Sequence, residues 1–303
     1  MARLRIGLVG ARGYVGSELV ALVEAHPALE LAWAASRSGA GTVGHVALEE
    51  LTPADVERRG ADAVVLALPN GQAAAWLPSL EKVPVVVDLS ADQRFNDAWV
   101  YGLPELHRAR IRSARRIANP GCYATGIQLG LAPLLPLLAE TPHVFGVSGY
   151  SGAGTTPADK NNPEKLRDNL MPYSLIDHAH EREVSHHLGR PVHFMPHVAP
   201  FFRGITLTMS MVLRQPRDRD ALRALFQERY GAEPLVRIVD DTPLVRDAVG
   251  SHRVTLGSIT TAGPRAVLVV TLDNLLKGAA TQALQNINLA LGRDEFEGIP
   301  IHG

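Results

Sequence analysis

The sequence is poor in features that would place a protein in a secreted, membrane-bound or nucleic-acid-binding class. It holds one cysteine in 303 residues, and a single thiol cannot close a disulfide within the chain, so we expect a reducing compartment. Lysine plus arginine number 30 against 31 aspartate plus glutamate, a balance that argues against nucleic acid or a membrane surface as a partner. No apolar run approaches the ~20 residues of a membrane span, and no separate signal-peptide core precedes the first apolar segment. We therefore expect a cytoplasmic globular protein, whose length favours two domains.

A glycine-rich turn stands close to the start of the chain. The apolar run 4–9 indicates a buried strand, and residues 17–26 carry apolar side chains at helical spacing. The glycines between them have G-x-x-G-x-x-G spacing. Strand, glycine turn and helix form the context in which a dinucleotide pyrophosphate binds, at backbone N–H groups and a helix N-terminus. A tight turn without a ligand is the alternative. The predicted cofactor contacts are Gly10, Arg12, Gly13, Tyr14, Val15 and Gly16.

The residues after the second apolar run, 29–35, bear on the choice of cofactor. An NAD site usually has an acidic residue there to hold the ribose 2′-hydroxyl. This chain has Ser36 and Arg37, and a hydroxyl and a guanidinium suit a 2′-phosphate, which a carboxylate would repel. The pattern predicts NADP(H), with an ordinary exposed arginine as the alternative.

Two further apolar runs, 61–69 and 83–90, are typical of parallel strands covered on both faces. Their alternation with helical or loop segments predicts a Rossmann-type, doubly wound α/β domain. After residue 122 the pattern changes, and period-2 runs at 143–150, 191–198, 205–213 and 265–272 predict a mixed, largely antiparallel sheet with one covered face. An amphipathic helix is expected at 218–230. The second half is thus predicted to be an α+β domain whose uncovered sheet face is a candidate subunit interface.

The lone cysteine follows a Pro-Gly turn and precedes a run with helical spacing. This places Cys122 at a helix N-terminus, where the helix dipole stabilises a thiolate and makes it a nucleophile. The alternative is a small buried apolar residue. A nucleophilic cysteine beside a hydride donor indicates the reduction of an acyl phosphate through a thioester, because carboxylates themselves resist hydride.

Such chemistry needs an acid/base, and six histidines lie between residues 177 and 197. His180 is preferred because it opens a predicted helix, with Glu183 one turn on to bind or orient substrate. His178 is the second choice, since positions two apart do not share a helix face. We expect no metal site, because no second cysteine exists and no metal-binding spacing is evident.

These segments together resemble the N-acetyl-γ-glutamyl-phosphate reductase family, NADPH-dependent enzymes of arginine biosynthesis related to aspartate-semialdehyde dehydrogenase. The matching segments cover nearly the whole chain in order, and "NPGCYATG" with "YGLPEL" upstream is the most specific. The others are "GLVGARGYVGSELV", "DLSADQRF", "SGYSGAG", "HEREV", "PFFRGITLT" and "DNLLKGAATQALQNINLALG".

The resemblance implies reduction of N-acetyl-L-glutamyl 5-phosphate to the 5-semialdehyde, with release of inorganic phosphate. It assigns Cys122 as nucleophile and His180 as acid/base. Substrate contacts are then expected at Arg94, Asn119, Glu183 and Arg203, and further cofactor contacts at Ser151, Gly152 and Lys277. It also implies a nucleotide-binding domain of residues 1–121 and 275–303, a catalytic and oligomerisation domain of residues 122–274, and a homodimer or homotetramer.

Three positions, Asn70, Gln93 and Thr155, depart from the pattern of this family, which has a histidine, an aromatic and a basic residue there. Other acids keep the same chemistry, namely an aspartyl phosphate or a carrier-bound aminoadipyl phosphate. A non-catalytic NADP-binding regulator is an alternative of a different class.

Overall fold

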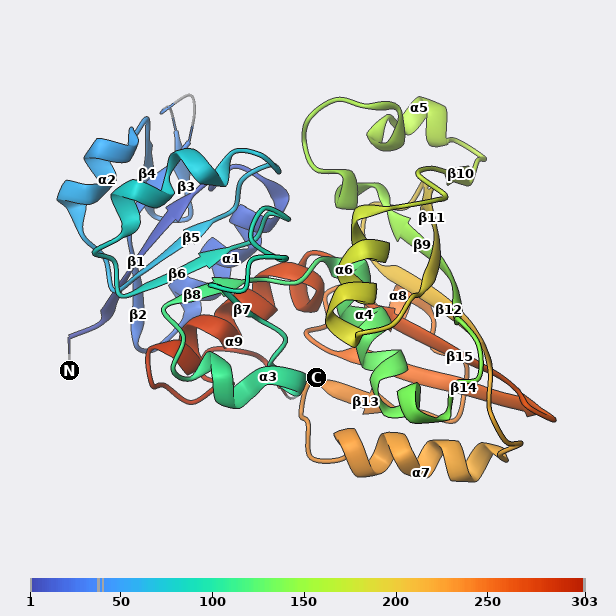
Figure 1. Ribbon diagram of the computed structural model, residues 1–303. Helices are drawn as coiled ribbons and strands as arrows, with labels where there is room; N and C mark the ends of the chain where they lie inside the picture. The colour runs from blue at the N-terminus through green and yellow to red at the C-terminus, as the bar shows by residue number, and fades with distance from the viewer. Residues whose placement is uncertain (1, 37–38, 40, 302–303) are drawn as a thin grey trace. The chain divides into compact units, whose positions relative to one another are not determined.

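The computed structural model describes residues 2–36, 39 and 41–301, and the chain divides into two compact units. The first unit runs up to Gly121 and resumes with the segment that starts at Ala279, and the second unit is Cys122–Gly278. Within the described residues the strands form two sheets, of eight and of seven strands, one in each unit (Figure 1).

The sheet of the first unit has the order β3-β4-β2-β1-β5-β6-β8-β7. Neighbouring strands run parallel except for the short β3–β4 pair. Its strands are β1 (Leu4–Val9), β2 (Leu29–Ala35), β3 (Thr42–Val43), β4 (Val46–Glu49), β5 (Ala63–Leu66), β6 (Val85–Asp88), β7 (Val100–Tyr101) and β8 (Arg116–Ala118). The four residues of β5 and of β6 are all buried, which is typical of a parallel sheet covered on both faces.

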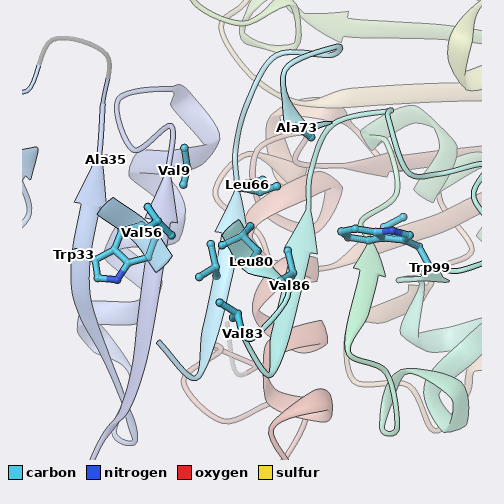
Figure 2. Packing of buried hydrophobic residues seen from close by; sticks show 12 residues of the cluster. Val9, Trp33, Ala35, Val56, Leu66, Ala73, Leu80, Val83, Val86 and Trp99 are labelled. Atoms are coloured by element: carbon cyan, nitrogen blue, oxygen red, sulfur yellow. The ribbon is translucent and has the colours of Figure 1, made fainter. Parts of the chain in front are cut away.

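Helices cover this sheet. They are α1 (Tyr14–Ala25), α2 (Pro53–Arg59), α3 (Pro104–Ile111) and α9 (Thr281–Ala290), with the 3₁₀ turns η1 (Ala73–Ala75) and η2 (Leu77–Leu80). Figure 2 shows one apolar cluster, in which Trp33 of β2 and Val86 of β6 pack with Val56 of α2 and Leu80 of η2. Helices α1 and α9 pack on each other and on the sheet, α1 on β1 and β2 and α9 on β6. The predicted doubly wound α/β fold is confirmed.

The sheet of the second unit is mixed, in the order β10-β11-β9-β12-β15-β14-β13. The β9–β11 and β13–β14 pairs are parallel and the other pairs antiparallel. Its strands are β9 (His143–Gly149), β10 (Met171–Pro172), β11 (His193–Ala199), β12 (Ile205–Val212), β13 (Val236–Ile238), β14 (Val254–Ala262) and β15 (Arg265–Leu272). Burial alternates along β12, so one face is covered and the predicted period-2 sheet is confirmed.

Helices α4 (Cys122–Leu131), α6 (Ala179–Leu188) and α7 (Arg219–Tyr230) belong to this unit. Helix α4 packs on β12, β15 and α6. The shorter pieces are η3 (Ala132–Leu137), η4 (Tyr150–Ala153), η5 (Asp159–Asn161), α5 (Pro163–Leu166) and α8 (Val245–Ala248). Among the described residues, no helix combines the length and apolar character needed to cross a bilayer.

Two helices differ from the apolar spacing of their sequence. The helical spacing after Cys122 continues to Leu134, but the helix ends at Leu131 and becomes the 3₁₀ turn η3, which contains Pro136. Proline lacks the N–H that an α-helix needs and clashes with the preceding turn. The C-terminal helix starts as a π-helical turn, η6 (Leu276–Ala280), through which the chain passes from the second unit to the first.

Candidate active site

In the first unit, the glycine turn joins β1 to α1. Gly10 has φ +90°, and a Cβ there would overlap the Ala67 carbonyl. A Cβ at Gly16 would lie 2.5 Å from the Gly10 carbonyl oxygen. Gly13 is the N-cap of α1 and provides no side-chain cap. Backbone groups therefore dominate this helix N-terminus, and the turn fits a pyrophosphate. Around it Arg12 is exposed, and Tyr14 and Val15 are half-buried.

Ser36, the predicted 2′-phosphate contact, follows β2 directly and is half-buried. Its backbone N–H donates to the Glu49 carbonyl at 2.9 Å, which ties the end of β2 to the end of β4. Arg37, the other predicted contact, lies outside the described residues.

Arg94 and Asn119, two predicted substrate contacts of the first unit, bind the chain itself. Arg94 is 7% exposed, and it donates from Nε to the Asn119 carbonyl at 3.0 Å and from Nη2 to the Leu89 carbonyl at 2.9 Å. The Asn119 side chain accepts a hydrogen bond from Asn286 Nδ2 of α9 at 2.9 Å. Both residues thus hold together the loops at the carboxyl ends of β6 and β8.

Two residues that depart from the family pattern also make local bonds. Asn70 Oδ1 accepts the backbone N–H of Ala91 at 2.9 Å, and Gln93 Oε1 accepts a hydrogen bond from Asn96 Nδ2 at 2.8 Å. Both stabilise the loops after β5 and β6. Thr155, the third such residue, is exposed.

In the second unit, Cys122 is the first residue of α4 and is half-buried. The predicted position at a helix start is therefore confirmed. Gly278 lies against it, because a Cβ added at Gly278 would come within 2.8 Å of the Cys122 Cβ. The first and last residues of the unit meet here, and only glycine allows this approach.

Tyr123 connects this cysteine to the histidines. Its ring is buried and lies edge-on to His180 at 5.8 Å and to Phe194 at 4.8 Å between centroids. Its hydroxyl donates to the His197 carbonyl at 2.8 Å. Burial, and then the negative charges of Tyr173 and Cys122, raise the pKa of Tyr123, so this phenol stays neutral. Sequence analysis did not single out Tyr123, although it is the next residue after the cysteine.

His178 and His180 lie together, contrary to the argument from helical spacing. His178 precedes the helix as the N-cap of α6, so the spacing within a helix does not apply to it. Its Nδ1 accepts the backbone N–H of His180 at 3.1 Å, and the two rings are 5.0 Å apart. Burial, followed by the charge of Lys160, lowers the pKa of His178 to about 4. His178 is therefore neutral at physiological pH, with Nδ1 as an acceptor.

Two glutamates of α6 have different surroundings. Glu183, the predicted substrate contact, is buried, and its charge opposes the lowering of the His178 pKa. Glu181 holds the helix in place, because its carboxylate accepts the Phe194 N–H of β11 at 2.7 Å and the Asp177 N–H at 3.0 Å. His178 and His180, which we call the histidine block, therefore lie at a helix start whose position is fixed by these hydrogen bonds.

Arg203 forms a two-point ion pair with Asp273. Arg203 Nε lies 2.7 Å from Oδ2, and Nη2 donates to Oδ1 at 2.9 Å. Asp273 is fully buried and also accepts backbone N–H groups of Gly250 and Leu275. Asp273 was not predicted as a site residue, although it opens the "DNLLKG" segment on which the resemblance drew.

The predicted cofactor contacts of the second unit gather near the same segment. Ser151 is buried, and its Oγ accepts a hydrogen bond from Asn274 Nδ2 at 2.9 Å. Gly152 follows it in η4, and a Cβ there would lie 2.9 Å from Ser148 Oγ. Lys277 is fully buried within the π-helical turn. In the part of the chain that the structure describes, His, Cys, Asp and Glu side chains form no group suited to a metal ion.

Two family models match the chain. Residues 5–114 match the NAD-binding domain of semialdehyde dehydrogenases, and residues 122–274 match the semialdehyde dehydrogenase dimerisation domain. Among solved structures, aspartate semialdehyde dehydrogenase II of Vibrio cholerae, complexed with ASA, superposes with a TM-score of 0.78 at 20% identity over 95% of this chain and 98% of its own. An aspartate semialdehyde dehydrogenase with NADP from Candida albicans gives 0.73 at 16% identity over 95% and 98%. These likenesses show the fold.

Much more similar sequences are also known. N-acetyl-gamma-glutamyl-phosphate reductase of Xanthomonas axonopodis pv. citri is 55% identical over 97% of this chain and 98% of its own length. The reductase of Xylella fastidiosa strain 9a5c is 53% identical over 99% and 95%. The chain therefore belongs to the N-acetyl-gamma-glutamyl-phosphate reductase family, which is built on the NAD-binding and dimerisation domains of the semialdehyde dehydrogenases.

Proposed function

We propose that the protein reduces N-acetyl-L-glutamyl 5-phosphate to N-acetyl-L-glutamate 5-semialdehyde with NADPH, releasing inorganic phosphate, as a step of arginine biosynthesis. Reductases that carry this name are more than half identical to the chain over nearly its full length. The observation that carries the proposal is the placement of Cys122 at the first residue of α4, with the His178–His180 block against the next residue.

The cofactor would be held mainly by the backbone. The turn from Gly10 to Gly16, including Arg12, Tyr14 and Val15, would take the pyrophosphate at the start of α1. Ser36 and Arg37 would take the 2′-phosphate, and Ser151, Gly152 and Lys277 the nicotinamide end. When bound, NADPH supplies the hydride that reduces the acyl group.

Cys122 is the nucleophile in this proposal. Its thiolate attacks the acyl carbon of the substrate, a C–S bond forms, and the C–O bond to phosphate breaks. The product on the protein is a thioester, whose carbonyl carbon accepts hydride more readily than that of a carboxylate. The N-terminus of α4 stabilises the sulfur anion both before attack and after release of the aldehyde.

His180 handles the protons. It takes the proton of the Cys122 thiol and protonates the oxygen that becomes negative as hydride reaches the thioester carbon. It recovers that proton when the resulting thiohemiacetal collapses to the aldehyde and the thiolate. His178 is neutral and accepts a hydrogen bond from the His180 backbone, so it is better suited to position His180 than to replace it.

The substrate carries a carboxylate and a phosphate, and we propose the two arginines as their partners. Arg94 and Arg203 each present a planar guanidinium that matches either group, and we propose Asn119 and Glu183 as further substrate contacts. The two arginines also hold the chain's own carbonyls or carboxylate, so their geometry is fixed before substrate binds.

We further propose a homodimer or homotetramer that acts in the cytoplasm. The match to a dimerisation domain supports association. On the uncovered face of the second sheet, the exposed side of β12 carries Thr206, Thr208 and Ser210, without a charge. An uncharged sheet face of this kind suits packing against a second copy.

The direct test is the reverse reaction with purified protein, NADP and N-acetylglutamate semialdehyde. We expect NADPH formation that depends on added phosphate, with kcat/KM at least tenfold higher than for aspartate semialdehyde, on the order that one missing substrate contact costs. Preference for aspartate semialdehyde would overturn the substrate assignment. NADPH binding without turnover of any aldehyde would support a regulator instead.

A further inference from the structure

A lysine outside the family motifs stands next to the histidine block. Between η4 and α6 an excursion of the chain forms η5 and α5 outside the sheet and then returns as the short edge strand β10 (Figure 1). Residues 155–159 of this excursion are exposed, whereas Lys160 is half-buried. Its Nζ lies over the ring of Tyr173, 5.2 Å from the centroid. The ammonium is therefore held against the Tyr173 ring.

Tyr173 fixes the position of this cation. Its backbone N–H donates to the Pro196 carbonyl of β11 at 3.2 Å, and its ring is edge-on to His178 at 5.4 Å. His178 in turn contacts His180, and His180 contacts Tyr123. A continuous series of ring contacts thus joins the Lys160 ammonium to the residue next to Cys122.

Lys160 differs from the other cations of the excursion in its charge partners. The other cations of the excursion have carboxylate partners, Lys165 with Asp159 at 2.7 Å and Arg167 with Glu164 at 2.6 Å. Within residues 2–36, 39 and 41–301, Lys160 has no ion pair with a carboxylate. Its field reaches His178, whose pKa it helps to lower. A half-buried cation beside neutral rings gains most from an anion that arrives from outside.

We propose that Lys160 binds an oxyanion of the acyl phosphate substrate, either its carboxylate or its phosphate, and so contributes to substrate affinity. This inference rests on the proposed function, which supplies a substrate with both anionic groups. The ammonium acts as a point charge held by the Tyr173 face. Such a contact is made in the ground state as well as in the transition state, so it affects KM more than kcat.

The reverse reaction tests this assignment, because the carboxylate and the phosphate then enter on separate molecules. KM is measured for N-acetylglutamate semialdehyde and for inorganic phosphate with wild type, Lys160→Met and Lys160→Arg. Lys165→Met is the matched control, since it removes a lysine of the same excursion that already has a carboxylate partner. Thermal unfolding of each variant checks that the substitution at Lys160 or Lys165 has left the fold intact.

We expect Lys160→Met to raise one of the two KM values about tenfold or more, the scale of a lost charge-assisted contact, with little change in kcat. A higher KM for the aldehyde would show that Lys160 binds the substrate carboxylate. A higher KM for inorganic phosphate would show that it binds the phosphate group. Lys160→Arg retains the charge and should restore most of the affinity, and Lys165→Met should behave as wild type. If Lys160→Met leaves both KM values unchanged in an active enzyme, the inference is wrong, whereas an inactive wild type would refute the proposed function instead.

Discussion

The two units use their polar residues in different ways. In the first unit, Arg94 and Asn119 bind backbone carbonyls and a helix of the same unit. The glycine turn there offers backbone groups to a ligand. In the second unit, side chains meet one another: Tyr123, His178 and His180 form one block beside Cys122. Polar residues of the family motifs thus bind the chain's own backbone in the first unit, whereas in the second unit they contact one another beside the proposed nucleophile.

This difference follows from the two sheets. A parallel sheet buried on both faces leaves its loops at the strand ends as the place for ligands, and those loops need internal hydrogen bonds to keep a shape. In the second unit, α4 packs on the mixed sheet and on α6, and Tyr123 and His180, in the first turns of the two helices, are in ring contact. Two helix N-termini thus bring Cys122, the proposed nucleophile, and a histidine into one region of the unit.

The largest difference between the two units is expected for Cys122→Ser, which should abolish turnover but not cofactor binding. Because a serine hydroxyl is not ionised by a helix N-terminus at neutral pH, kcat should fall at least about a thousandfold, on the scale of losing a nucleophile. NADPH affinity should change little, because most of the proposed cofactor contacts, the Gly10–Gly16 turn with Ser36 and Arg37, belong to the first unit. Steady-state rates and a fluorescence titration with NADPH measure the two quantities. A variant that keeps its turnover would contradict the assignment of chemistry to the second unit.

His180→Asn and His178→Asn separate the proposed acid/base role of His180 from the positioning role of His178 within the second unit. The loss of an acid/base costs about 10²–10⁴-fold in rate, so His180→Asn should lower kcat by at least a hundredfold. Asparagine is a good N-cap residue, so His178→Asn should keep the start of α6 and lower kcat by less than about tenfold. Pre-steady-state and steady-state rates check this. The reverse order of effects would make His178 the acid/base.

Arg94→Met tests whether this residue of the first unit mainly supports structure. The change leaves the carbonyls of Leu89 and Asn119 without a donor, and unsatisfied buried groups cost about 1–3 kcal/mol each. The free energy of unfolding in urea should fall by at least about 1 kcal/mol. Unchanged stability with a raised KM would instead show that substrate recognition is its main role.

The smallest effect concerns pH. The pKa of His178 falls from 6.5 to about 4 on folding, so between these values the unfolded chain binds a proton that the folded chain does not. Its contribution to stability is full above pH 6.5 and is lost as the pH falls toward 4. Melting temperatures of wild type should therefore drop more steeply over this range than those of His178→Asn. Parallel curves would show that burial does not hold His178 neutral.

Local patterns predicted much of the fold. The runs at 4–9, 29–35 and 205–213 became β1, β2 and β12 almost residue for residue, because each is apolar on the faces that its sheet buries. Strand β14 was not predicted, since a bulge between Gly257 and Thr260 interrupts its alternation. Such a bulge is set by the partner strand β15 and leaves only a weak local signal.

A site residue could be predicted from the sequence where its location depends only on its position within one helix or strand. Cys122 was placed from the Pro-Gly turn and the helix that follows. The contact of His178 with His180 was missed because it depends on where α6 begins, one residue after His178. Asp273 and Lys160 were missed because their roles depend on partners 70 and 13 residues away, Arg203 and Tyr173.

The central claim, that the Cys122 thiol carries the acyl group, is tested most directly by a reaction without phosphate. Purified protein is mixed with N-acetylglutamate semialdehyde and NADP, and NADPH absorbance and the mass of the Cys122 peptide are recorded. The account predicts a burst of NADPH equal to the enzyme concentration and one acyl adduct on that peptide. Adding phosphate should remove the adduct and turn the burst into continuous NADPH formation, and in Cys122→Ser neither burst nor adduct should form. A burst of NADPH with an unmodified Cys122 peptide, or an adduct that persists in Cys122→Ser, would contradict it.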